Sequence, residues 1–421
     1  MWTVPQFQEV LATLRDPSSP IGMRMRAAYY AKQLFVDLRK EETDEGKDGD
    51  DTDAKKSERS QKMEDIVTVL CEQVFVKEHG SLLRHEFAYV LGQMKTEQAC
   101  TALEYLLSKE DDCVMVRHEA AEALGAIASP RSKLVLEATK TEYEGVLDEL
   151  SDTCLLALNR LDHETKDEDE KNDSLVVGCA CMLAPFNSVD PVEVDPAHVS
   201  LSTAELGDIL LNKQSGGQSD ETNETDDKSA GNLVERYRAM FSLRNRGGDE
   251  CVRQLCRALV EDTSSPLLRH EVAFVLGQLQ HPSSISALEE SLSRLDEHAM
   301  VRHESAEALG AIEGTFEDWQ RIESILTRYQ KDFDPAVAES CIVALDAADY
   351  WGHDKADPES EVPCGEEKKD DINGDVESEE KVDERTTGGA FGKQKHDSTL
   401  VESCEIRKQI LAQHFNVVQG S

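Results

Sequence analysis

One short frame occurs four times in this chain, and its spacing constrains the fold more than any other feature. Each copy begins with Arg-His-Glu, continues with an apolar stretch and reaches a Leu-Gly pair. The histidines of the four copies are His85, His118, His270 and His303. The first two are 33 residues apart, as are the last two, and the second pair follows the first at an offset of 185 residues. Since each copy matches its counterpart at this offset better than its neighbour, we infer a repeat protein with a duplicated half.

Each repeat is predicted to hold two helices. Ala, Leu and Glu dominate the copies, and apolar residues recur at spacings of three and four, as on one face of a helix. The partner helices are expected near 96–107 and 284–292. Weaker copies of the frame lie at 24–29, 151–158, 236–241 and 338–345. We therefore predict an all-α fold, an α-solenoid of HEAT-like repeats in two halves of four helical pairs each.

The glycine of the Leu-Gly pair falls inside the helical part of each copy. These glycines are Gly92, Gly125, Gly277 and Gly310. Because glycine has no side chain, we expect it here to allow neighbouring helices to approach closely.

The charge balance excludes some classes of function. The chain has 421 residues, with 45 Lys and Arg against 85 Asp and Glu, so its formal net charge is −40. A direct nucleic-acid binder needs a basic surface, so we expect no nucleic-acid partner. We also expect no membrane partner, since no apolar run approaches the ~20 residues of a membrane span. An acidic surface attracts basic partners.

Three segments are too rich in charge and too poor in apolar residues to form a packed core. They divide the chain into an N-terminal half with an acidic insertion that we expect to be a loop, a linker, a C-terminal half and a tail that we expect to be disordered. The predicted boundaries are 1–162 for the first half with its insertion at 40–62, 163–230 for the linker, 231–350 for the second half and 351–421 for the tail. Within the linker, 201–206 has the pattern of a short capped helix, and the apolar run 176–183 is expected to pack on a neighbour.

The cysteines and the N-terminus indicate the compartment. Eleven cysteines are scattered along the chain and never spaced C-x-x-C, which is typical of reduced thiols rather than of a disulfide framework or a zinc finger. The first residues lack the basic start and apolar stretch of a signal peptide. We expect a protein of the cytoplasm or the nucleus.

The recurring His-Glu pairs are candidate metal ligands. The alternative is that they belong to the repeat framework, but the outer copies keep the helical frame without the pair, and a framework role should extend to all copies. Equivalent helices of a solenoid stack at about 8–10 Å, so two side chains from neighbouring helices can reach one ion. If the two halves face each other across a pseudo-two-fold axis, we expect a central dinuclear site. Its candidate ligands are His85, Glu86, His118, Glu119, His270, Glu271, His303 and Glu304.

The kind of ligand restricts the metal. Imidazole and carboxylate without thiolate disfavour structural zinc, and magnesium and calcium seldom take so many imidazoles. Two histidines with one or two carboxylates per ion are typical of non-haem iron that activates oxygen, although manganese or catalytic zinc would accept the same set. Adjacent residues on a helix point ~100° apart, so not every glutamate need bind metal. Glu122 and Glu307, one turn after His118 and His303, are candidates for supporting residues or for solvated surface.

The four Arg-His-Glu copies on HEAT-like repeats resemble the deoxyhypusine hydroxylase family. Leu-Leu-Arg-His-Glu and Val-Arg-His-Glu each occur twice, and the resemblance covers about 20–38, 64–160 and 233–348. The stretch 187–191, Asn-Ser-Val-Asp-Pro, also looks like the linker between the halves of that family. The acidic insertions and the tail depart from the family pattern and leave its motifs intact.

The resemblance implies a deoxyhypusine monooxygenase with two iron ions as cofactors and O2 as co-substrate. Its substrate would be the deoxyhypusine side chain of a eukaryotic translation initiation factor, and its product hypusine, with an external reductant. One ion would be bound by His85, His118 and Glu119, and the other by His270, His303 and Glu304. Glu86 and Glu271 would bind metal or meet the cationic amine of the substrate. We expect no further catalytic residue, no other bound cofactor and a monomer.

Other functions stay open on the residues alone. A non-catalytic HEAT-repeat scaffold that binds a basic protein would need no metal. A repeat protein like the bilin lyases would leave the His-Glu pairs without a role. A di-metal hydrolase would share the ligands and lack oxygen dependence.

Overall fold

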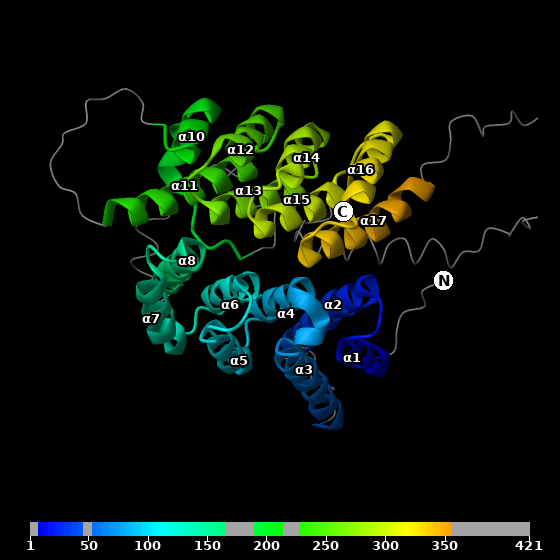
Figure 1. The fold of residues 1–421 in the computed structure, drawn as a ribbon. Coiled ribbons are helices and arrows are strands. Elements are labelled where there is room, and N and C mark those ends of the chain that lie inside the picture. The colour runs from blue at the N-terminus through cyan, green and yellow to red at the C-terminus, as the bar shows by residue number, and fades with distance from the viewer. Residues whose placement is uncertain (1–6, 45–52, 165–188, 214–226, 355–421) are drawn as a thin grey trace, which may run out of the picture.

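The computed structural model describes residues 7–44, 53–164, 189–213 and 227–354. Within these ranges the regular elements are all helices, and two layers of helices lie one above the other, formed by the two halves of the chain (Figure 1). The predicted all-α fold of two halves with four helical pairs each is confirmed. No helix in the described ranges combines the length and the apolar character that a bilayer crossing requires.

The N-terminal half is a row of four helical pairs. They are α1 (Phe7–Arg15) with α2 (Ile21–Asp44), α3 (Asp53–Gln73) with α4 (Gly80–Met94), α5 (Glu97–Leu107) with α6 (Val114–Ile127), and α7 (Lys133–Tyr143) with α8 (Asp148–Glu164). The even-numbered helices pack side by side and face the other half, while the odd-numbered helices cover their outer side. Short 3-10 turns at Lys77–His79 and Pro130–Ser132 precede α4 and α7.

The C-terminal half repeats this arrangement. Its pairs are α10 (Thr203–Leu210) with α11 (Asp227–Arg246), α12 (Asp249–Glu261) with α13 (Pro266–Leu279), α14 (Ile285–Ser293) with α15 (Ala299–Ala311), and α16 (Phe316–Tyr329) with α17 (Pro335–Asp354). The 3-10 turns Pro196–Ser200 and Pro282–Ser284 precede α10 and α14. The capped helix expected at 201–206 is α10, where Ser202 and Glu205 form a capping box. The apolar run 176–183 lies outside the described residues.

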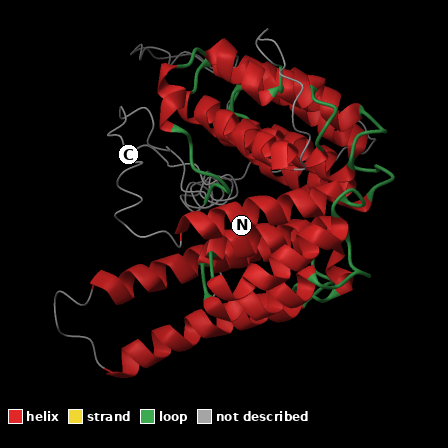
Figure 2. Cartoon of the chain, turned by 90° about the vertical axis from the view of Figure 1, so that its left-hand side faces the viewer, coloured by secondary structure: helices red, strands yellow, loops and turns green. Residues whose placement is uncertain are grey.

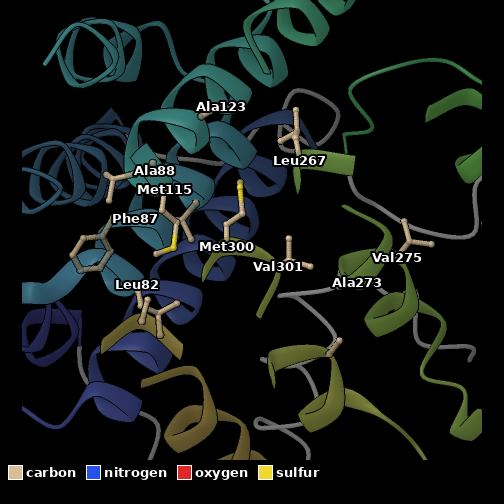
Figure 3. Close-up of a cluster of buried hydrophobic side chains, with 14 of the residues drawn as sticks. Leu82, Phe87, Ala88, Met115, Ala123, Leu267, Ala273, Val275, Met300 and Val301 are labelled. Carbon is tan, nitrogen blue, oxygen red and sulfur yellow. The ribbon is translucent and has the colours of Figure 1, made fainter. Parts of the chain in front are cut away.

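The two halves meet at both ends of their rows. Helix α8 packs against α11 and α13, and α17 packs against α2 and α4. At the second contact Arg26 of α2 pairs with Asp346 of α17. One apolar core therefore runs through both halves, and Figure 3 shows part of it, with Phe87 and Met115 from one half and Met300 and Val275 from the other.

Small residues set the spacing of the inner helices. A side chain at Gly92 would lie 2.8 Å from the Cα atom of Ala123, and one at Gly125 would lie 2.8 Å from that of Ala157. Gly310 meets Ala344 in the same way. The expected role of these three glycines in close helix packing is confirmed, and that of Gly277 stays a prediction.

The arginine that precedes each histidine belongs to the repeat framework. Arg84 donates from Nε to the carbonyl oxygen of Val74 at 2.6 Å and pairs through both terminal nitrogens with Asp112. Arg302 makes the same contacts to Leu292 and Asp332. Since both arginines are buried, each one ties its inner helix to the C-terminal end of the preceding outer helix and to the loop before the next inner helix.

The segment 40–62 differs from its expected loop character. Helix α2 continues to Asp44 and α3 begins at Asp53, so the segment is helical wherever the structure describes it. Its Glu, Lys, Arg and Gln residues favour helix, and Lys62 pairs with Glu58 one turn away at 2.8 Å. The two helices extend beyond their neighbours on one side of the molecule (Figure 2). In the other half Gly247 and Gly248, both with positive φ, separate α11 from α12.

Candidate metal centre

The four His-Glu pairs lie on the inner helices at the middle of the molecule. His85 and Glu86 are on α4, His118 and Glu119 on α6, and their counterparts are on α13 and α15. All eight side chains are buried, with exposed fractions of 5% or less. Outer copies carry no such pair, so only the two central repeats of each half supply these groups.

The four imidazoles form one cluster. Ring centroids within a half lie 5.4 Å apart for His85 and His118, and 5.5 Å apart for His270 and His303. Across the halves, His85 lies 5.2 Å from His303, and His118 lies 5.3 Å from His270. The pseudo-two-fold arrangement expected from the repeat spacing therefore brings all four rings together.

Two of the four glutamates point into this cluster. Glu119 Oε2 lies 3.1 Å from His85 Nε2, and Glu304 Oε2 lies 3.5 Å from His270 Nε2. The donor atoms of His85, His118 and Glu119 lie within 4.8 Å of one another, as do those of His85, His270 and His303. The first group matches the ligand set that the resemblance implies for one ion.

The other two glutamates lie beside the cluster. Glu86 accepts a hydrogen bond from the Tyr29 hydroxyl and lies 3.2 Å from His85 Nδ1. Glu271 lines the cavity described below. This division separates Glu119 and Glu304 from Glu86 and Glu271, in line with the less direct role expected for the second pair.

The imidazole cluster fits a metal. Among the described residues, neither ring nitrogen of His118 or of His270 has a hydrogen-bond partner. A buried polar atom without a partner costs free energy, and a metal ion would satisfy several such nitrogens at once. Burial lowers the pKa of His270 to about 3 and that of His118 well below its ordinary value, so both rings are neutral at pH 7, the form that binds metal. The assignment of individual ligands stays a prediction.

His85 differs from the other three histidines. Although burial opposes a charge on its ring, the carboxylates of Glu119 and Glu86 raise its pKa well above the ordinary value. A bound cation would take over the role of this proton, because it would neutralise the same carboxylates.

A small cavity of about 30 Å³ adjoins the imidazoles. It is lined by His85, Glu86, Tyr89, Gln93, Glu119, Glu122, Val189, Asp190, Pro191, His270, Glu271, Phe274 and Glu304. Its wall thus carries six carboxyl groups and no Lys or Arg. Burial raises the pKa of Glu122 to about 8, with Glu119 adding to the effect, and burial and Glu122 raise that of Glu271.

Sequence reasoning missed several residues of this wall. Tyr89 and Phe274 face each other with ring centroids 6.5 Å apart, and they occupy the same place in their repeats, which the 185-residue offset would have revealed. Asp190 is held by Arg244, whose terminal nitrogens donate to it at 2.7 and 2.5 Å. The stretch containing Asp190 was expected only to join the halves, yet it closes one side of the cavity.

Comparisons with known proteins agree with this architecture. The HEAT repeats family model matches residues 68–149, 229–310 and 252–346. A deoxyhypusine hydroxylase of Danio rerio is 43% identical over 284 residues, covering 66% of this chain and 79% of the relative. The chain belongs to the deoxyhypusine hydroxylase family. A second family member, deoxyhypusine hydroxylase-B of Oryza sativa subsp. japonica, is 41% identical over 280 residues, with 66% of this chain and 81% of the relative covered.

A solved structure supports the same membership. The structure of human deoxyhypusine hydroxylase in complex with glycerol matches with a TM-score of 0.61 and 32% identity, covering 82% of this chain and 96% of that one. As a member of the deoxyhypusine hydroxylase family, the chain is an enzyme, an oxidoreductase of hypusine biosynthesis built from HEAT repeats. The predicted family, fold and enzyme class are thereby confirmed.

Proposed function

We propose that this chain hydroxylates the deoxyhypusine side chain of a translation initiation factor to give hypusine. One atom of O2 enters a C–H bond as the new hydroxyl group, and the other leaves as water with two electrons and two protons from an external reductant. The observation that carries the proposal is the convergence of four buried imidazoles and the carboxylates of Glu119 and Glu304, from both halves, in one cluster beside a cavity.

Two iron ions are the cofactors that we propose. His85, His118 and Glu119 would hold one ion, and His270, His303 and Glu304 the other. When bound, the ions supply the redox chemistry that activates oxygen. Magnesium and calcium fit this nitrogen-rich set poorly.

The protein itself provides a negatively charged place for the substrate. The cavity wall combines the aromatic rings of Tyr89 and Phe274 with carboxyl groups, and deoxyhypusine is a cationic lysine derivative with an aliphatic chain. Rings pack against the aliphatic part, and carboxylates pair with the cationic nitrogens. The net charge of −40 favours capture of such a partner.

Elemental analysis and a hydroxylation assay test the proposal together. Protein purified without added metal is expected to contain iron, close to two ions per chain. With O2 and a reductant it should add one oxygen atom to a deoxyhypusine-bearing factor, seen by mass spectrometry, and argon should abolish the gain. A metal-free protein that still bound the factor would support a scaffold instead, and turnover without O2 would support a hydrolase.

A further inference from the structure

A groove beside the cavity carries positive charge in an otherwise acidic protein. This α2–α4 groove has a volume of about 320 Å³ and is lined by Phe35, Val36, Arg39, Lys40, Gln93 and Met94. Gln93 also lines the cavity at the imidazoles, so the groove and the cavity adjoin at this residue. The cavity wall holds six carboxyl groups, whereas the groove wall holds two cations and no Asp or Glu.

The cations gather where α4 ends. Arg39 donates from Nη1 to the carbonyl oxygen of Met94 at 3.1 Å, which is one of the last carbonyl groups of α4. This bond uses one guanidinium donor, and Arg39 has no ion-pair partner within the described ranges. Lys95 follows Met94 directly. Partial burial, followed by the charge of Arg160, lowers the pKa of Lys95, and the charge of Arg39 adds to this effect, so these cations lie near one another.

The α2–α4 groove belongs to the N-terminal half alone. Arg24 and Arg236 occupy the same place in their repeats, so Arg246, the last residue of α11, corresponds to Leu34. Helix α2 continues to Asp44, beyond its neighbours (Figure 2), and all the groove residues that it supplies lie in this extension. A nearly two-fold site therefore has its cationic groove on one side.

A cationic groove in a strongly acidic chain favours a partner that presents carboxylates at that place. The formal net charge of −40 repels an acidic surface elsewhere on the protein, so the cations of the groove fix where such a surface can dock. Phe35, Val36 and Met94 add an apolar lining, and the Gln93 amide can both donate to and accept from a peptide group. This combination suits a peptide segment better than an inorganic anion.

We propose that the α2–α4 groove binds an acidic segment of the protein substrate, close to the modified lysine that enters the cavity. This inference rests on the proposed function. The cavity would recognise the modified side chain, and the groove would recognise the protein that carries it. Because exposed ion pairs contribute little affinity each and act mainly on association, the groove should affect KM and its salt dependence rather than kcat.

Charge reversal in the metal-loaded full chain tests this inference. The variant combines Arg39→Glu with Lys95→Glu, and the matched control combines Arg253→Glu with Arg257→Glu on α12 of the other half. The probes are the intact deoxyhypusine-bearing factor and a short deoxyhypusine peptide without Asp or Glu. For the factor, the groove variant should raise KM about tenfold at low salt, with kcat unchanged. For the peptide, both parameters should stay within about twofold of wild type.

Salt and helix content keep the outcome clear. Sodium chloride at about 0.5 M should remove most of the difference, since it screens exposed charges. Circular dichroism should show the same helix content in both double variants. A KM for the factor equal to that of the control, or the same loss with the short peptide, overturns the inference.

Two other results have distinct meanings. A lower KM for the factor in the groove variant also overturns the inference, because an acidic segment of this chain would then occupy the groove. Wild-type protein that hydroxylates neither probe would instead overturn the proposed function.

Discussion

The imidazole rings of His85 and His303 lie 5.2 Å apart, although the two residues belong to different halves of the chain. No single half can bring these rings together. The centre therefore depends on the packing of α8 against α11 and α13, and of α17 against α2 and α4.

Removal of one central imidazole should release metal without unfolding the protein. His303→Ala removes one of the three proposed ligands of one ion. At least half of the bound metal should therefore be lost, as measured by elemental analysis. Circular dichroism should show unchanged helix content. His281→Ala is the control, because His281 pairs with Asp249 at the surface. Full metal content in His303→Ala would show that His303 is not a ligand.

A methyl group at Gly92 should destabilise the N-terminal half. Its Cβ would lie 2.8 Å from both Cα and Cβ of Ala123, so α4 and α6 would have to separate. Such overpacking costs about 1–3 kcal/mol, which urea denaturation can measure. Gly22→Ala is the control, since its Cβ would meet a side-chain oxygen of Asp346, which can move aside, and its effect should stay within about 0.5 kcal/mol. Equal stability of the two variants would contradict this account of helix spacing.

Removing only one partner of the ion pair between Arg302 and Asp332 should lower the free energy of unfolding strongly. Both side chains are at most 3% exposed, so Arg302→Met leaves a buried carboxylate without its partner. The expected loss in the free energy of unfolding is about 3–5 kcal/mol. The double variant with Asp332→Leu should recover a large part of it. No recovery would indicate that the lost bond to the Leu292 carbonyl, rather than the unpaired charge, sets the cost.

Acid should destabilise the fold through His79. Arg24 donates to its Nδ1 at 3.0 Å, and its Nε2 lies 3.1 Å from the Gln73 side-chain oxygen, so the neutral ring is the one that fits. Burial, followed by the charge of Arg24, lowers the pKa of His79 to about 4. The unfolded chain binds this proton near pH 6.5, so the stability from the neutral ring is present above pH 6.5 and is lost as the pH falls toward 4.

Denaturation at several pH values measures this effect. The free energy of unfolding of wild type should fall more steeply between pH 6.5 and 4 than that of His79→Gln, by up to about 1.4 kcal/mol per pH unit. Parallel curves would mean that folding does not lower the pKa of His79.

Periodicity in the sequence predicted the parts of the molecule that repeat. The four His-Glu pairs, the inner helices that carry them and the helix-spacing glycines all recur at fixed offsets. Residues at the same place in successive repeats lie on neighbouring stacked helices, so their relative positions could be predicted. The arginine of the motif recurs as well, and it also stands in the outer copies as Arg24 and Arg236, a wider distribution that agrees with the framework role seen in the structure.

Features that occur once could not be predicted in this way. Asp190 has no copy in the other half, so nothing in the sequence showed that it would meet Arg244 beside the cavity. The Ser340 hydroxyl donates to Glu307 at 2.8 Å, whereas that of Thr153, at the matching repeat position, donates to the Glu149 carbonyl oxygen at 2.7 Å. The sequence does not tell which acceptor such a hydroxyl takes. The charged segment 40–62 was expected to be a loop because its composition forms no core. It extends α2 and α3, which are anchored by buried residues elsewhere, and lengthening an existing helix adds a backbone hydrogen bond per residue without a new nucleus.

Each half contributes two of the four central histidines, and the halves touch at two equivalent contacts. A free half would have to pair with a copy of itself to assemble the same cluster of rings. The chain is thus equivalent to a homodimer fused into one polypeptide. Fusion allowed the neighbours of Glu122 and Glu307 to diverge, with Thr153 in one half at the repeat position of Ser340 in the other, since two identical subunits cannot carry different side chains at matching positions.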